Sequence, residues 1–243
     1  SPSRGLGDVY KRQEYTKQTI IICFLLQGIA LSSRAQEQQV WQRYYDKCRR
    51  EASIIDTLPS KLEKALHWSP TINKEQKEVI RYILWNMVYV EGGTANLGDN
   101  NNYPVDVASF FINRYEVSQD EWYVIMGENP SNQHRRNYPV DQVNWFNAQR
   151  FTQKLSQLSG LPFRLPFEAE WEYAARGGLK TKNFIYAGSN NAEQVAWFRE
   201  KYYNTYVSKE TGTKKPNELG LYDMSGNVYE SVSYTHLTLP TNR

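Results

Sequence analysis

Residues 164–178 read Arg-Leu-Pro-Phe-Glu-Ala-Glu-Trp-Glu-Tyr-Ala-Ala-Arg-Gly-Gly, and this stretch decides the fold. Good helix formers fill much of residues 168–176. The glycine pair at 177–178 gives a stop signal directly after them. The stretch therefore predicts a short helix with a defined C-terminal end.

Helices and strands are predicted on both sides of this stretch. Ser118 and Glu121 form a capping box that opens a helix, which ends at Gly127. Residues 143–158 carry apolar side chains at helical spacing, and Gly160 follows them. Apolar runs predict two strands, at residues 87–93 and 110–115. Long irregular stretches lie between and after these elements, and no internal repeat is evident.

Residues 36–85 are predicted to form a helical N-terminal extension. Its first part is polar and carries aromatic and apolar side chains near helical spacing, with Pro59 and Pro70 as interruptions. Residues 74–85 form a second predicted helix with a single apolar stripe. We expect the extension to pack onto the main domain.

Residues 14–35 have the pattern of a signal peptide. An apolar run at 19–31 follows Lys17 and precedes the small residues Ser33 and Ala35, and the run is too short to span a bilayer. A buried core helix is the alternative interpretation of the run. A lipid anchor at Cys23 is not expected, because the residue before it is not small. The prediction is therefore a periplasmic or secreted protein with no membrane span after leader removal.

The two ends are interpreted as adapter-derived sequence. Residues 8–13 and 231–236 can be translated from opposite strands of one DNA tag, and they resemble translated transposon adapters. We therefore leave 1–13 and 231–243 out of the fold prediction. These ends carry the whole formal net charge of +3, so residues 14–230 sum to zero. A neutral chain gives no indication of nucleic-acid or membrane-surface binding.

Cysteine and histidine are too few and too scattered to form a metal cluster. The chain has 2 Cys, at positions 23 and 48, and both precede the main domain. The 3 His are His67, His134 and His236. A cluster of soft or imidazole ligands is therefore not predicted within residues 14–230.

Taken in order, the motifs resemble the formylglycine-generating-enzyme (sulfatase-modifying-factor) family over residues 86–230. The motifs that carry the resemblance are residues 87–93 with Gly98, 116–118, 129–131, 139–140 with 143–145, 164–178 and 216–230. The resemblance implies an α+β fold that is similar to C-type lectins and has much irregular structure. Residues 86–230 would then be a partial formylglycine-generating-enzyme-like domain, and the helical extension would precede it.

Phe167 departs from the family pattern, which usually has Thr at this position. A Thr would cap the helix that begins at residue 168 and would pair with Glu170 in a capping box. Phe167 has no acceptor for that hydrogen bond, and loss of a cap costs about 1 kcal/mol. We therefore predict that Phe167→Thr stabilises the domain.

Residues 223–230 carry a candidate calcium site. Carboxylates and backbone carbonyls are ligands that suit a hard cation such as calcium. From spacing alone, a capped turn with solvated acids is the alternative. The resemblance implies a structural calcium held by the side chains of Asp223 and Glu230 and by the carbonyls of Gly226 and Val228. Tyr229 stands where the family usually has Trp.

The resemblance implies a copper-dependent oxidase that converts a Cys of a sulfatase polypeptide to formylglycine. In the family, the paired active-site Cys lie downstream of the position where this chain ends, and copper would be confined to that C-terminal part. No catalytic or cofactor-binding residue is assigned within residues 14–230, so we expect this chain to be inactive alone. One alternative is a noncatalytic C-type-lectin-like binding or surface-assembly module. An iron-dependent sulfoxide synthase, the other alternative, is disfavoured because no His cluster is visible.

Overall fold

The computed structural model describes residues 18–19, 23–24, 65–98, 103–198 and 207–233. The helices are α4 (Lys74–Trp85), α5 (Gln119–Met126), α6 (Trp145–Ser159), α7 (Glu168–Ala175) and α8 (Ala192–Val195), with a 3-10 turn, η2 (Gly178–Lys180). The strands are β1 (Gln18–Thr19), β2 (Cys23–Phe24), β3 (Met87–Val90), β4 (Gly93–Leu97), β5 (Tyr103–Val107), β6 (Phe110–Asn113), β7 (Phe163–Arg164) and β8 (Tyr229–Glu230). The mixture of helices, short strands and irregular chain confirms the predicted α+β class.

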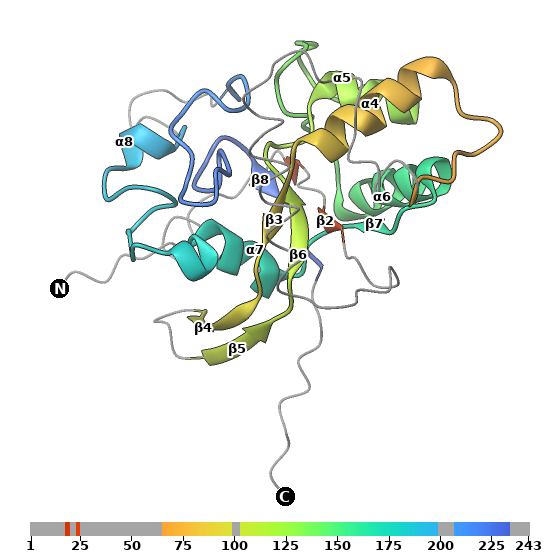
Figure 1. Ribbon diagram of the computed structural model, residues 1–243. Coiled ribbons are helices and arrows are strands. Elements are labelled where there is room, and N and C mark those ends of the chain that lie inside the picture. Colours follow the sequence, from red (N-terminus) through yellow and green to blue (C-terminus); the bar gives the residue numbers. More distant parts are fainter. Residues whose placement is uncertain (1–17, 20–22, 25–64, 99–102, 199–206, 234–243) are drawn as a thin grey trace, which may run out of the picture.

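A four-stranded sheet in the order β3-β6-β2-β7 lies at the centre of the molecule (Figure 1). Strands β3 and β6 pair antiparallel, from Met87 opposite Asn113 to Val90 opposite Phe110. All four residues of β6 are buried, as expected for an inner strand covered on both faces. Strands β4 and β5 form a separate antiparallel hairpin, and β1 pairs parallel with β8.

Local signals in the sequence set most helix boundaries. The Ser118 hydroxyl accepts from the Glu121 amide at 3.2 Å while the Glu121 carboxylate accepts from the Ser118 amide at 2.7 Å, so the predicted capping box is confirmed. Helix α6 begins at Trp145 rather than at residue 143, because the Asn144 side chain accepts from the Asn147 amide and caps the helix there.

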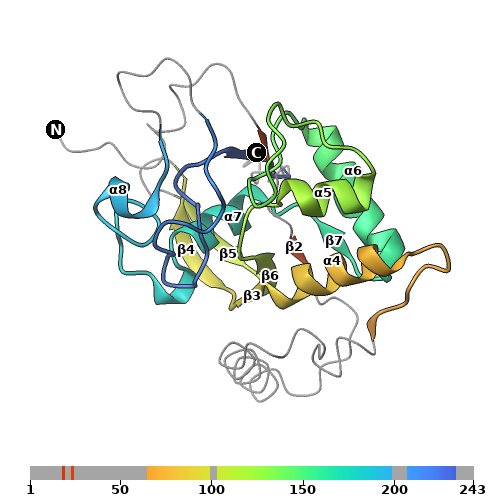
Figure 2. The same cartoon turned by 90° about the horizontal axis from the view of Figure 1, so that it is seen from above.

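Helices α4, α5 and α6 pack together on one side of β3 and β6 in both views (Figures 1 and 2). We call these three helices and the apolar cluster around them the helical half. At its centre the rings of Trp122 and Phe151 stack with centroids 5.0 Å apart and an interplanar angle of 4°. The stack is buried, which makes it a main contributor to the apolar core.

The opposite side of the sheet holds α8 and much irregular chain (Figures 1 and 2). We call α7, α8, the β4–β5 hairpin and residues 207–233 the loop half. Its apolar cluster is smaller and includes Phe110, Tyr173 and Leu221. Polar side chains hold much of its backbone, as where the buried Asn217 amide donates to the carbonyls of Ala174 at 2.8 Å and Ala175 at 3.2 Å.

The described residues test only part of the predicted helical N-terminal extension. The predicted helix at residues 74–85 is confirmed as α4. Residue His67 donates its backbone N–H to the Ser159 carbonyl at 2.8 Å, so the chain before α4 packs onto the end of α6. Residues 36–64, and with them Cys48, lie outside the described residues.

Only two short pieces of the predicted leader are described. Strand β2 pairs antiparallel with both β6 and β7, which places Cys23 opposite Ile112 on one side and Arg164 on the other. This piece of the apolar run is therefore a strand and not the buried helix considered as the alternative. Within the part of the chain that the structure describes, no helix is long and apolar enough to cross a membrane. Removal of residues 14–35 as a signal peptide stays a prediction.

The first residues of the C-terminal segment contact the main domain. The Ser233 amide donates to the Pro166 carbonyl at 2.8 Å, and the indole N–H of Trp145 donates to the Val232 carbonyl at 2.9 Å. Residues 234–243 lie outside the described residues, and the adapter origin of 231–243 stays a prediction.

Candidate cation-binding site

The backbone of residues 223–230 bends through two left-handed residues. Asp223 has φ 59° and Asn227 has φ 70°. Gly226 lies close to the backbone of another segment. A Cβ at this position would lie 2.4 Å from the carbonyl oxygen of Trp197, so only glycine allows that approach. The Trp197 carbonyl also accepts from the backbone N–H of Asn227 at 2.8 Å.

Asp223 is buried, and one of its two carboxylate oxygens has no partner. The side chain is part of a residue that is 3% exposed. Its Oδ2 accepts from the Gly212 amide at 2.7 Å, whereas the buried Oδ1 has no hydrogen-bond partner. Burial raises the pKa of this carboxyl to about 6, against the effect of the Gly212 hydrogen bond.

In Glu230, too, one carboxylate oxygen is hydrogen-bonded and the other has no partner. Oε2 accepts a very short hydrogen bond from the indole N–H of Trp171 on α7. Oε1 is buried and has no partner, although the residue as a whole is partly exposed. Burial raises the pKa of this carboxyl to about 8; the negative charge of Asp223 adds to the rise and the Trp171 hydrogen bond opposes it.

Glu116 is a third buried acid, and sequence reasoning gave it no role. It is 1% exposed, and its carboxylate accepts from the Asn227 side-chain amide at 2.6 Å and from the Val228 backbone N–H at 3.3 Å. Burial raises the pKa of Glu116 well above its ordinary value, and the negative charges of Asp223 and Glu230 contribute. Glu116 lies in the motif at residues 116–118, but no local sequence pattern indicates that its side chain binds a loop 111 residues away.

Among the described residues, these contacts leave the carboxyl groups of Asp223, Glu230 and Glu116 without a positively charged partner. The described ion pairs join Lys74 with Glu78, Arg136 with Asp120, Arg164 with Glu170 and Arg176 with Glu172. None of them involves the three buried acids of the site. A buried carboxylate without a countercharge or hydrogen bond is costly. The arrangement therefore favours a bound cation.

The donor set fits a hard divalent ion. Asp223 Oδ1 and Glu230 Oε1 are buried carboxylate oxygens with free lone pairs, and calcium binds oxygen ligands of this kind. Within the described ranges, no group of three or more His, Cys, Asp or Glu side chains is placed to hold a metal ion. A calcium ion would therefore also need backbone carbonyls, and those of Gly226 and Val228 stay the predicted ones.

Helix α7 positions the Trp171 indole against Glu230. The Phe167 amide donates to Glu170 Oε2 at 2.8 Å, so half of a capping box opens the helix, and Phe167 supplies no side-chain cap. Glu170 also binds Arg164 through two contacts of 2.6 and 2.8 Å. The helix ends at two left-handed glycines, Gly177 with φ 92° and Gly178 with φ 54°, as the opening stretch predicted.

No thiol pair lies in the described part of the chain. Cys23 is in β2, and Cys48 is outside the described residues. His67 and His134 are both exposed, and His67 Nδ1 lies 2.9 Å from the Ala65 carbonyl oxygen. The described residues therefore offer candidate oxygen ligands for a cation but no cluster of sulfur or imidazole ligands.

Comparison with known proteins places the chain in a family. The model of the sulfatase-modifying factor enzyme 1-like domain matches residues 73–236. Chaperone protein LppX of Paenibacillus barcinonensis is 34% identical over 198 residues, covering 60% of this chain and 70% of LppX. The formylglycine-generating enzyme of Mus musculus is 31% identical over 128 residues, which is 48% of this chain and 32% of that enzyme.

The fold has a counterpart among solved structures. The crystal structure of CarF superposes with a TM-score of 0.52 and 25% sequence identity, covering 63% of this chain and 82% of CarF. The chain thus spans most of CarF but about a third of the mouse enzyme's length. Since the family model covers more than half of the chain, this protein belongs to the family of the sulfatase-modifying factor enzyme 1-like domain.

Proposed function

We propose that this protein is an exported sulfatase-modifying factor that takes part in converting a sulfatase Cys to formylglycine. Residues 86–230 would be the scaffold of that activity, with a structural calcium at residues 223–230. The observation that carries the calcium site is the pair of buried carboxylate oxygens without partners, Asp223 Oδ1 and Glu230 Oε1. Family membership supports the sulfatase as the partner.

Calcium would supply the positive charge that the site lacks. Asp223 and Glu230 would bind it by side chain, and Gly226 and Val228 by carbonyl. Glu116 would not be a ligand, because both of its oxygens already accept hydrogen bonds from Asn227 and Val228. It would hold the loop in the shape that presents the ligands.

The oxidation itself needs groups that these residues do not supply. A thiolate pair is the ligand set that suits Cu(I), and the main domain contains no Cys. An oxidase of this kind would therefore take its thiols, and its copper, from outside residues 86–230. Export would follow from the signal-peptide pattern at residues 14–35.

A noncatalytic binding module of the same fold is the second candidate. One observation favours it: the chain covers 70% of a relative named as a chaperone protein. Such a protein would bind a sulfatase or another exported polypeptide without changing it. Fold alone does not decide between these functions.

The test supplies the protein with copper and with a sulfatase-derived peptide that carries the target Cys. Loss of the thiol and appearance of an aldehyde that a hydrazide probe captures would support the oxidase. Binding of the peptide or of an intact sulfatase without aldehyde formation would support the binding module. Absence of both binding and conversion would reject the sulfatase as partner.

A further inference from the structure

Residues 209–212 lie between the candidate cation loop and an exposed loop, residues 132–138, and they are hydrogen-bonded to both. We infer that this segment, which we call the strap, couples cation binding at residues 223–230 to the ordering of residues 132–138. The inference rests on the calcium site proposed above. It adds to that site a surface, residues 132–138, whose order would depend on the cation. The link consists of two contacts, one between Asp223 and Gly212 and one between Asn137 and Glu210.

The ends of the strap bind the cation loop. The Asn227 side chain accepts from the Lys209 amide at 2.8 Å and donates to the Lys209 carbonyl at 3.2 Å, so it pairs with both backbone groups of that residue. The Gly212 amide donates to Asp223 Oδ2 at 2.7 Å. Both anchors therefore belong to the loop that would hold the cation.

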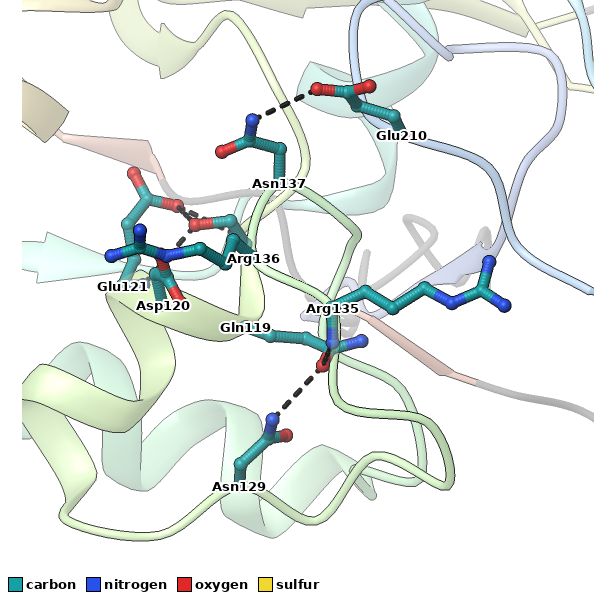
Figure 3. Close-up of polar contacts among 9 residues, drawn as sticks. Gln119, Asp120, Glu121, Asn129, Arg135, Arg136, Asn137 and Glu210 are labelled. Atoms are coloured by element: carbon teal, nitrogen blue, oxygen red, sulfur yellow. Dashed lines mark hydrogen bonds and ion pairs between the residues drawn. The ribbon is translucent and has the colours of Figure 1, made fainter.

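The middle of the strap binds the exposed loop. The Asn137 side-chain amide donates to the Glu210 carboxylate at 2.9 Å (Figure 3). The Thr211 amide and hydroxyl both donate to the Asn137 carbonyl, at 3.0 and 3.3 Å. Positions 209 and 212 thus contact one loop, and positions 210 and 211 contact the other.

A second anchor of the exposed loop is independent of the cation site. Gln119 is buried on α5, and its side-chain oxygen accepts from the Asn129 side chain at 3.0 Å and from the Arg135 amide at 2.9 Å (Figure 3). Its amide group donates to the Pro139 carbonyl at 3.3 Å. Gln119 fixes the base of the loop, so the strap can control only the outer part that contains Asn137.

The coupling follows from the two oxygens of one carboxylate. A cation bound at Asp223 Oδ1 would fix the Asp223 side chain, and with it Oδ2, the oxygen that accepts from the Gly212 amide. When Gly212 is held in place, residues 210 and 211 lose less conformational entropy on binding Asn137. Because coupling between sites is reciprocal, the contact with Asn137 would also strengthen cation binding.

The part of the molecule that would respond is an exposed basic surface. His134, Arg135 and Arg136 are exposed, and the Arg135 guanidinium lies 5.0 Å from the centre of the Tyr138 ring. Arg136 forms an exposed ion pair with Asp120 at 3.1 Å. Calcium would thus change how firmly these side chains are presented.

Hydrogen–deuterium exchange measured by mass spectrometry tests the inference on the full chain, in calcium chloride and in a chelator, with magnesium chloride as the ion control. Calcium is expected to slow exchange in residues 223–230 and, by about fivefold or more, in residues 132–138, as for a typical coupling between sites. In Glu210→Ala combined with Asn137→Ala, protection of 223–230 should persist while protection of 132–138 falls in part, because the Thr211 amide and hydroxyl can still donate to the backbone carbonyl of residue 137.

Two conservative changes serve as controls. Glu210→Gln keeps an oxygen that accepts from Asn137, and Asn132→Ala removes an exposed amide from the same loop, where only the backbone N–H of Asn132 bonds Asp141. Both should retain calcium protection of residues 132–138. Glu210 and Asn137 are exposed, so their replacement is not expected to unfold the domain.

The outcomes separate the two claims. Protection of residues 223–230 without any change at 132–138 would overturn the coupling and leave the calcium site standing. Equal protection of 132–138 in the double variant and in the controls would overturn the strap as the route. No effect of calcium at 223–230 would overturn the calcium site, and the coupling with it.

Discussion

The helical half and the loop half of this molecule are stabilised in different ways. In the helical half, apolar side chains fill the space between helices, and the stacked rings of Trp122 and Phe151 lie at its centre. In the loop half, buried polar side chains such as Asn217 and Asn227 hold irregular backbone, and two carboxylate oxygens have no partner. The helical half therefore depends on packing, whereas the loop half would depend on a cation.

The largest expected effect is a core truncation in the helical half. Phe151→Ala removes one ring of the buried stack and should lower the free energy of unfolding by about 3–5 kcal/mol. Urea denaturation followed by circular dichroism measures this loss, which should be the same in calcium and in a chelator. Tyr123→Ala on α5 is the control, because its exposed ring should change stability by less than about 0.5 kcal/mol.

Calcium removal is expected to have the next largest effect, in the loop half. A ligand present at about 100 times its Kd stabilises a protein by about 2.7 kcal/mol, so a chelator should lower the melting temperature of the wild type. Asp223→Asn should abolish this response, because the neutral side chain keeps an oxygen for the Gly212 amide but loses the charge. Asp106→Asn, at an exposed position of β5, should respond as the wild type does. A chelator response that survives in Asp223→Asn would contradict the assigned site.

The contrast between the halves also explains what the sequence could predict. Caps such as Ser118 with Glu121 and stops such as Gly177 act over a few residues, so α5 and the end of α7 were predicted correctly from local signals. The place of β2 between β6 and β7 was not predictable, because it depends on pairing with Ile112 and Arg164, far along the chain.

The residues of the candidate cation site also divide into those that local sequence signals indicate and those that only the folded chain brings together. Asp223 and Glu230 were candidates because they lie in one continuous motif. Glu116 and the strap residue Gly212 were missed, since only the folded chain brings them to Asn227 and Asp223. The need for glycine at position 226 also comes from the folded chain, because the neighbour that excludes a side chain there is the Trp197 carbonyl.

Glu121 gives a smaller, pH-dependent effect in the helical half. Burial raises its pKa above the ordinary value of 4.5, hydrogen bonds from Ser118 oppose the rise, and the negative charge of Asp120 adds to it. Tyr82 on α4 also faces this carboxyl. The folded state therefore binds the proton more tightly than the unfolded state does, and the stabilisation is complete below pH 4.5 and is lost as pH rises through the folded pKa.

Glu121→Gln should remove this pH dependence. The amide oxygen can still accept from the Ser118 N–H, and a neutral side chain costs less to bury. The free energy of unfolding between pH 4.5 and 8 should fall less steeply in the variant than in the wild type, by about 1.4 kcal/mol for each unit by which the folded and unfolded pKa values of Glu121 differ. Parallel curves for the two proteins would show that Glu121 does not titrate in this range.

The smallest expected effect is at Phe167, on the border between the halves. Phe167→Thr would add the missing side-chain cap of α7, a gain of about 1 kcal/mol. It would also remove the ring that lies 4.4 Å from the Arg164 guanidinium, a contact that contributes about 0.5–1 kcal/mol. The net increase in unfolding free energy should therefore be under about 0.5 kcal/mol. Phe167→Leu, which loses the ring and gains no cap, should be the less stable variant; a Thr variant no more stable than the Leu variant would show that a cap adds nothing at this helix start.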